Sequence, residues 1–182
     1  MNDDLDLGVE LINTVYLLAD PPDRLTTTEY FRALLRRGDE IQLAAELADT
    51  DLDRLRTLRE QLRPLFECED RARATALANA MLSEYAAVPQ LSQDGDGSVR
   101  IRPAGHARGF DALAARIVAA VAEHLVAHGI RRLGVCAAAP CDCVFVDRTR
   151  PGTRKYCCDG CNDRAAAAAH YRRRQTNRPA DE

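Results

Sequence analysis

Residues 136–161 read CAAAPCDCVFVDRTRPGTRKYCCDGC and contain six of the seven cysteines of the chain. Two outer pairs, Cys136/Cys141 and Cys157/Cys161, flank a segment that we expect to form a β-hairpin. Paired cysteines on either side of a spacer are typical of a structural zinc site, because four thiolates complete the tetrahedral shell of Zn²⁺. Disulfide bonds and simple packing are the alternatives. The clustering favours a single structural zinc ion over both.

The spacing of the cysteines leaves one ligand open. Cys136 and Cys141 suit the first half of the site, and Cys161 suits the second. Spacing alone favours Cys158, with two residues between it and Cys161, over Cys157 as the remaining ligand. Cys143 lies one strand position beyond the first pair.

The segments around the cysteines predict a small metal-held module over residues 131–182. Residues 131–135 suit a short strand, residues 144–146 form an apolar run, and Pro151-Gly152 suits a turn. The alanine-rich segment after Cys161 predicts a helix. This order of knuckle, hairpin and helix is that of a treble-clef or zinc-ribbon module. A unit this small buries too little to fold alone, so we expect it to unfold without zinc.

The residues before this module predict a mainly α fold. Apolar side chains recur at helical spacing over residues 5–18, 26–38, 39–48, 50–65, 69–87 and 109–128. Pro64 is expected to kink or close the fourth of these helices near Arg63. Turn residues and alternating side chains over 91–102 predict one small β-hairpin. We therefore expect a helical domain over residues 1–130, followed by the zinc module.

Two polar residues interrupt the apolar pattern of the first helix. Asn13 and Thr14 are poor helix formers that compete for backbone hydrogen bonds. The favoured interpretation places both on the polar face of that helix, because Asn is mostly exposed in folded proteins. The alternative is that Asn13 satisfies a buried polar neighbour or lines a pocket.

Charge is distributed unevenly between the two halves. Residues 1–130 carry 14 arginines and 22 acidic residues, a net charge of −8, whereas residues 131–182 carry 11 basic and 6 acidic residues, a net charge of +5. A basic end on an acidic body favours a polyanionic partner such as nucleic acid, and a solvated basic face is the alternative. The candidate nucleic-acid-binding residues are Arg148, Arg150, Arg154 and Lys155 on the expected hairpin loop, and Arg164, Arg172, Arg173 and Arg174 on the expected helix.

Other classes of protein find little support in the sequence. The N-terminus is acidic and lacks the cationic region of a signal peptide, and no apolar run is long enough to span a bilayer. We therefore expect a cytoplasmic protein with no membrane partner. No phosphate-binding glycine loop, nucleophile elbow or convincing acid/base pair is present, and four thiolates leave zinc no open position. The sequence does not predict an enzyme.

The C-terminal block resembles the CGNR zinc finger. Cys136-x4-Cys141, Phe145, Asp147, Tyr156-Cys157 and Cys161 with Arg164 occur in the order of that motif. The Gly-Asn pair that follows the last cysteine in the family is Asn162-Asp163 here. The aromatic-Cys match implies that Cys157, rather than Cys158, is the third zinc ligand.

The N-terminal segment Glu10-Leu-Ile-Asn-Thr-Val15 resembles the signature that begins the ABATE domain. The two resemblances together imply a stress-responsive transcription regulator. Its zinc finger would bind DNA, and its helical domain would bind a small-molecule effector or a second copy of the chain. An RNA-binding zinc-ribbon protein and a zinc-stabilised protein-interaction module are the alternatives.

Overall fold

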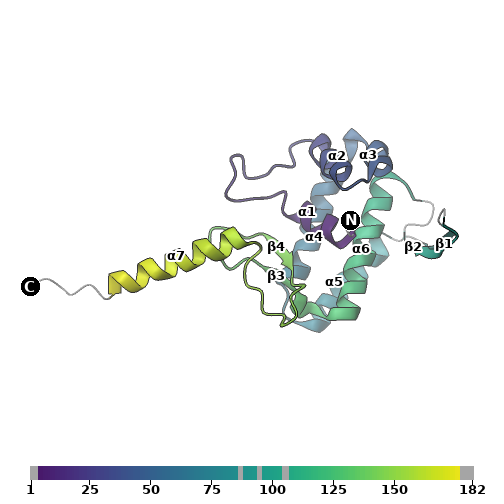
Figure 1. Cartoon of the computed structure of the whole chain (residues 1–182). Helices are drawn as coiled ribbons and strands as arrows, with labels where there is room; N and C mark the ends of the chain where they lie inside the picture. The colour runs from purple at the N-terminus through teal and green to yellow at the C-terminus, as the bar shows by residue number, and fades with distance from the viewer. Residues whose placement is uncertain (1–3, 86–87, 94–95, 104–106, 177–182) are drawn as a thin grey trace, which may run out of the picture.

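The computed structural model describes residues 4–85, 88–93, 96–103 and 107–176 (Figure 1). Most of the chain is helical, with two small antiparallel sheets, which confirms the mainly α class. The elements are α1 (Asp4–Ile12), α2 (Thr28–Arg37), α3 (Ile41–Glu46), η1 (Asp49–Asp51), α4 (Leu52–Glu67), α5 (Arg71–Glu84), β1 (Gln90–Gln93), β2 (Val99–Arg102), α6 (Gly109–His128), η2 (Ile130–Arg132), β3 (Leu133–Val135), β4 (Val144–Val146) and α7 (Asp159–Thr176).

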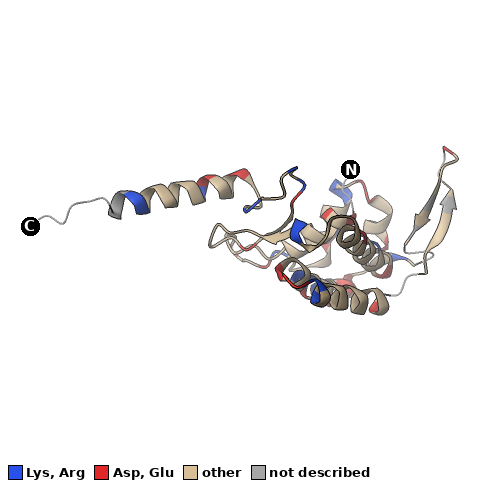
Figure 2. Cartoon of the chain, turned by 90° about the horizontal axis from the view of Figure 1, so that it is seen from below, with Lys and Arg blue, Asp and Glu red and all other residues tan. Residues whose placement is uncertain are grey.

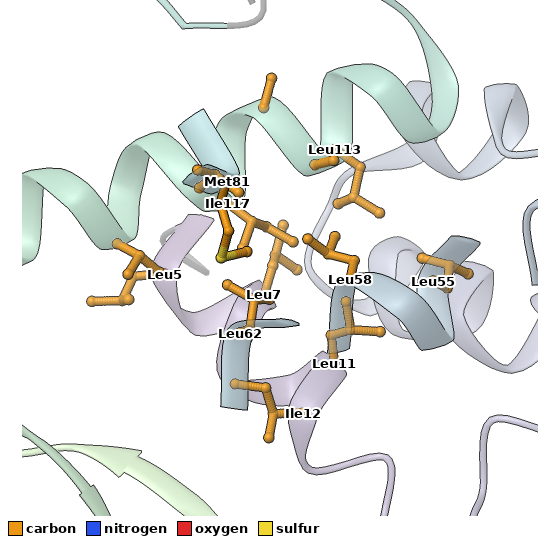
Figure 3. Packing of buried hydrophobic residues seen from close by; sticks show 14 of the residues in the cluster. Leu5, Leu7, Leu11, Ile12, Leu55, Leu58, Leu62, Met81, Leu113 and Ile117 are labelled. Atoms are coloured by element: carbon orange, nitrogen blue, oxygen red, sulfur yellow. The ribbon is translucent and has the colours of Figure 1, made fainter. Parts of the chain in front are cut away.

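The core of the helical body lies between α1, α4, α5 and α6 (Figure 3). The predicted leucine stripe of α4 points into it, and Leu58 and Leu62 are completely buried. α1 approaches α6 closely because Gly8 has no side chain; a Cβ there would lie 2.9 Å from Ile117. Each large apolar side chain buried here contributes about 1.5–3 kcal/mol of transfer free energy. None of the helices in the described part of the chain combines the length and apolarity needed to cross a lipid bilayer.

The strands β3 and β4 attach the cysteine-rich segment to this core. They pair antiparallel, with Val135 opposite Val144 and Gly134 opposite Phe145. Leu133, Val144 and Val146 belong to the same buried cluster as the helices, and β3 and β4 pack against α4. The strands of the zinc module therefore belong to the apolar core of the helical body, while Cys136, Cys141 and Cys161 lie in a second buried cluster.

The first helix is shorter than predicted. α1 ends at Ile12 instead of continuing to residue 18, and the favoured interpretation of Asn13 as a polar-face residue was wrong. The half-buried Asn13 side chain forms two hydrogen bonds with the backbone of Val144: Nδ2 donates to the carbonyl at 2.9 Å, and Oδ1 accepts from the N–H at 2.8 Å. The helix ends here because the Asn13 amide binds a strand that is distant in sequence.

The expected β-hairpin between the two outer cysteine pairs was also wrong. β4 pairs with β3 across the Cys136–Cys141 knuckle, and not with the residues that follow the basic loop. That loop instead folds around the buried carboxylate of Asp147, which accepts from the Thr149 N–H at 2.9 Å and the Arg154 N–H at 2.8 Å. The alternative that Pro64 closes the fourth helix near Arg63 was wrong as well: α4 continues past Pro64 to Glu67, since Leu65 and Phe66 remain buried in the core.

Candidate metal centre and basic surface

Four cysteines converge on one point of the C-terminal module. The Sγ atoms of Cys136, Cys141, Cys157 and Cys161 all lie within 4.8 Å of one another. Cys157 Sγ is 3.7 Å from that of Cys141 and 3.5 Å from that of Cys161. Four thiolates bound to zinc at about 2.3 Å stand about 3.8 Å apart, whereas a disulfide requires about 2.05 Å. The cluster thus has the dimensions of a zinc site, and no disulfide joins any of the seven cysteines, all of which the structure describes.

Each ligand is delivered by a different local structure. Cys136 follows β3, and its backbone N–H donates to the Cys143 carbonyl at 2.9 Å. Cys141 closes the knuckle by donating its N–H to Ala138. Cys157 lies at the end of the basic loop, and Cys161 lies in the first turn of α7. Zinc therefore connects three segments, namely the knuckle, the end of the basic loop and α7; the knuckle and the loop are also joined by a hydrogen bond from the Ala137 N–H to the Lys155 carbonyl at 2.9 Å.

Burial affects two of the four thiols most clearly: it raises the pKa of Cys161 to about 11 and also raises the pKa of Cys157. The pKa of Cys141 is lowered despite its burial, because neighbouring backbone and thiol groups donate hydrogen bonds to its sulfur. A divalent cation is needed to hold four thiolates in such a place, because buried charges require compensation. The four residues form a single structural zinc site. Its shell is filled by protein ligands, so the ion supplies folding energy and leaves no position for substrate.

The other two cysteines of this segment, Cys143 and Cys158, are not among the four converging thiols. Cys157 lies among the four converging thiols, while Cys158 is exposed on the outer surface. The resemblance, and not the spacing, therefore pointed to the residue that the fold brings into the site. Cys143 is buried beside the cluster, and burial raises the pKa of its thiol to about 12, which favours a neutral packed thiol.

Two of the predicted nucleic-acid-binding arginines support the metal site instead of pointing freely outward. Arg164 Nη2 donates to the Ala138 carbonyl at 2.9 Å and to Cys161 Sγ at 3.3 Å. Arg154 donates to the carbonyls of Tyr156, at 2.7 Å, and Cys157, and its guanidinium lies 5.2 Å from the centre of the Phe145 ring. Both side chains fix the backbone that carries the zinc ligands.

The other predicted cations form two exposed groups. Arg150 and Lys155 lie on the loop before α7, and Arg172 and Arg173 lie near the end of α7. Arg148 is also exposed, and it forms an ion pair with Asp6 of α1 at 2.7 Å. Arg174 lies in α7, but its side chain is outside the described residues. Figure 2 shows these basic segments at the far end of α7 and on the loop near its first turn.

The sequence indicated one contact between the zinc module and the helical body, that of Asn13, but only as the alternative interpretation, and it gave no sign of the others. Besides the Asn13 pair, Arg63 Nη2 donates to Asp142 Oδ2 at 2.9 Å. A signal for Asn13 was present, because a polar residue ending an apolar helical pattern is a candidate for a buried hydrogen bond. No such signal marks Arg63 or Asp142, which are ordinary surface residue types.

Comparison with known families agrees with this architecture. A sequence model of the ABATE family, described as "Putative stress-induced transcription regulator", matches residues 5–129. A model of the CGNR zinc finger matches residues 132–174. Among proteins of curated function, no match to this chain was found.

Proposed function

The chain belongs to the ABATE family and carries a CGNR zinc finger, and from this premise we propose that it is a DNA-binding transcription regulator. The observation that carries the proposal is the zinc site, which fixes a loop and a helix that both display exposed cations. Lys and Arg on a rigid surface bind phosphates and release counterions from DNA. The net charge of +5 on residues 131–182 supports a polyanionic partner for this end of the chain.

The helical body is proposed to act as the sensing or interaction domain. A cavity of about 480 Å³ lies between α4, α5 and α6, a size suited to a small molecule. Its wall includes Tyr85 and Phe110, whose ring centres are 6.1 Å apart, and Arg54, whose guanidinium lies 4.0 Å from the Phe110 ring. An effector bound here, or a second copy of the chain, would act on the zinc finger through the shared core.

A salt titration of DNA binding tests the proposal. A slope near −3.6 in log affinity against log salt would follow if each of four exposed cations, Arg150, Lys155, Arg172 and Arg173, neutralised one phosphate. We therefore expect the affinity of the zinc-loaded chain for duplex DNA to fall about 100-fold between 50 and 200 mM salt. Binding that is undetectable, or insensitive to salt, would contradict the proposal.

Matched arginine variants locate the binding surface. Arg172→Ala/Arg173→Ala is expected to weaken binding to all DNA sequences and to reduce the salt slope. Arg71→Ala/Arg73→Ala removes two exposed arginines from α5 and should leave binding unchanged. Single-stranded RNA as a competitor separates the alternatives, because a preference for RNA would favour an RNA-binding role. If the chain binds a protein partner and still binds it after the α7 arginines are replaced, a protein-interaction module is favoured.

A further inference from the structure

We propose that α7 enters the major groove of duplex DNA and that Asn162 reads base edges there. This inference rests on the proposed DNA-binding function and names the element and residue that give it sequence preference. The exposed cations on either side of Asn162 would hold phosphates. Asn is suited to the role because its amide can donate to and accept from adenine at N7 and N6.

The position of α7 leaves most of its surface accessible. Both views show the helix projecting away from the body and from the rest of the zinc finger (Figures 1 and 2). Cys161 is buried, and Arg164 and Ala165 are half-buried, so the first turns hold α7 on the finger. Among the described side chains beyond Ala165, all are exposed apart from the half-buried Ala169. Eighteen residues give a helix about 27 Å long.

The width of α7 fits the major groove. Its middle is the run Ala165–Ala169, which adds only methyl groups to the helical backbone. The major groove of B-DNA is about 12 Å wide and admits an α-helix. Small side chains let the backbone approach the base edges, and alanine methyl groups can contact the methyl group of thymine. An apolar face that extended beyond this alanine run would instead indicate that α7 packs against a protein partner.

One stripe of the helix combines the groups that such a contact needs. Asn162, Ala166, Ala169 and Arg173 are spaced i, i+4, i+7 and i+11 and therefore lie on one face of the helix. Asn162 is exposed, and no hydrogen bond connects its side-chain amide to any residue that the structure describes. Arg173 lies on the same face about 16 Å further along the helix axis.

The charges divide α7 into parts with different roles. Its first turns present no exposed cation, because Arg164 turns back to Ala138 and Cys161, while Asp159 and Asp163 expose carboxylates that repel phosphates. The exposed cations lie on the preceding loop and at the far end of the helix. Phosphates would therefore be held at the two ends, with the base edges between them. The exposed Asp and Asn side chains in the first turns of α7 can both form hydrogen bonds with base edges.

A hollow beside Asn162 provides a place for the phosphate on the loop side. It measures about 620 Å³ and lies between the basic loop and the first turn of α7. Asp159 also lines the hollow, and its carboxylate opposes the binding of an anion there. Asn162 shares the wall with Lys155 and Thr153, both of which are exposed hydrogen-bond donors. A phosphate bound by these two residues would place the neighbouring bases next to Asn162.

Selection from a random duplex library tests this inference with the full zinc-loaded chain. We expect the wild type to select sites with adenine at one fixed position, and Asn162→Ala to lose discrimination there by about tenfold or more. Its affinity for random-sequence DNA should stay within about twofold of the wild type, because the phosphate contacts remain. Asn79→Ala, which removes an exposed asparagine from α5, should select the same sites as the wild type. Replacing the selected adenine by 7-deazaadenine should weaken wild-type binding and leave Asn162→Ala unaffected.

The outcomes distinguish the two proposals. If the zinc-loaded chain binds no DNA, the proposed function fails and this inference fails with it. If the chain binds DNA in a salt-dependent way but selects no sequence, or if Asn162→Ala selects the same sites as the wild type, only this inference is overturned. The zinc content and circular dichroism of each variant confirm that a loss of selection does not come from unfolding.

Discussion

Asn13 and Val144 are 131 positions apart in the sequence, and two hydrogen bonds of 2.9 and 2.8 Å connect them. The Asn13 amide presents a donor and an acceptor to the backbone of β4, as a neighbouring strand would. The carbonyl of Asn13 in turn accepts from Arg24 at 2.7 Å. This side chain thus helps to fix the zinc finger to the helical body, together with the Arg63–Asp142 and Arg148–Asp6 ion pairs. That role explains why an asparagine ends the apolar pattern of α1.

Removing this side chain should destabilise the whole protein. Asn13→Ala leaves the N–H and the carbonyl of the buried Val144 without partners, and we expect the free energy of unfolding to fall by about 2–3 kcal/mol. Urea unfolding measures this loss. Asn79→Ala, at an exposed position on α5, is the control and should change the stability by less than about 0.5 kcal/mol. Equal stabilities of the two variants would contradict the role given to Asn13.

Zinc removal should weaken the helical body as well as the finger. Leu133, Val144 and Val146 belong to the core of the body, and they are carried by strands that the zinc knuckle connects. In calorimetry, we expect the zinc-loaded chain to unfold in one transition, and a chelator to lower the temperature of that transition. A body transition that is unchanged after chelation would show that the two parts fold independently.

The ion pairs of Arg116 predict a dependence of stability on pH. Arg116 binds Glu40 at 2.5 Å and Asp4 at 2.6 Å, and its hydrogen bonds hold the pKa of Glu40 below its ordinary value despite partial burial. A carboxylate with a lowered pKa in the folded state adds stability above its ordinary pKa, and this stability is lost as the pH falls through the folded value.

The matching variant is Glu40→Gln. We expect it to reduce the free energy of unfolding by about 1 kcal/mol at pH 7, and by progressively less as the pH falls below about 4. Denaturant unfolding at several pH values gives the comparison. Glu60→Gln, at an exposed site on α4, should show no such convergence with the wild type. A difference between Glu40→Gln and wild type that is constant with pH would refute the assignment.

Two neighbouring cations of the basic loop should behave differently. Arg154 binds two carbonyls next to the zinc ligands and lies over Phe145, so Arg154→Ala should cost about 1–2 kcal/mol of stability and weaken zinc retention. Lys155 is exposed, and Lys155→Ala should leave the stability unchanged while reducing the salt slope of DNA binding by about 1. Thermal unfolding and DNA titration of both variants check this. If Lys155→Ala instead lowered the stability and Arg154→Ala changed only the salt slope, Lys155 would be the residue that supports the zinc site and Arg154 the one that binds phosphate.

Local signals predicted the helices and the cysteine site well. The leucine stripe of α4 and the periodic apolar residues of α6 determine which faces are buried, and Gly129 ends α6 with a positive φ of 72°. The cysteines are sufficiently clustered in sequence to predict one zinc ion. These features depend on neighbours within a few turns, which is the range over which sequence patterns are informative.

Contacts between distant segments could not be predicted in the same way. Asn13 binds β4, and Arg164 and Arg154 bind the backbone of the finger, although each resembles an exposed polar residue in the sequence. The pairing of β3 with β4 depends on how the knuckle reverses the chain. Tertiary packing also keeps α4 helical through Pro64, where local propensity predicts a break. Such outcomes depend on which surfaces meet in the folded protein.

One zinc ion, held by Cys136, Cys141, Cys157 and Cys161, organises the C-terminal module. X-ray absorption at the zinc edge of the purified chain tests this assignment most directly. We predict one zinc per chain with four sulfur ligands at about 2.3 Å, with an unchanged spectrum in Cys158→Ser and a lost or altered site in Cys157→Ser. Fewer than four sulfurs, or oxygen or nitrogen in the zinc shell of the wild type, would contradict it.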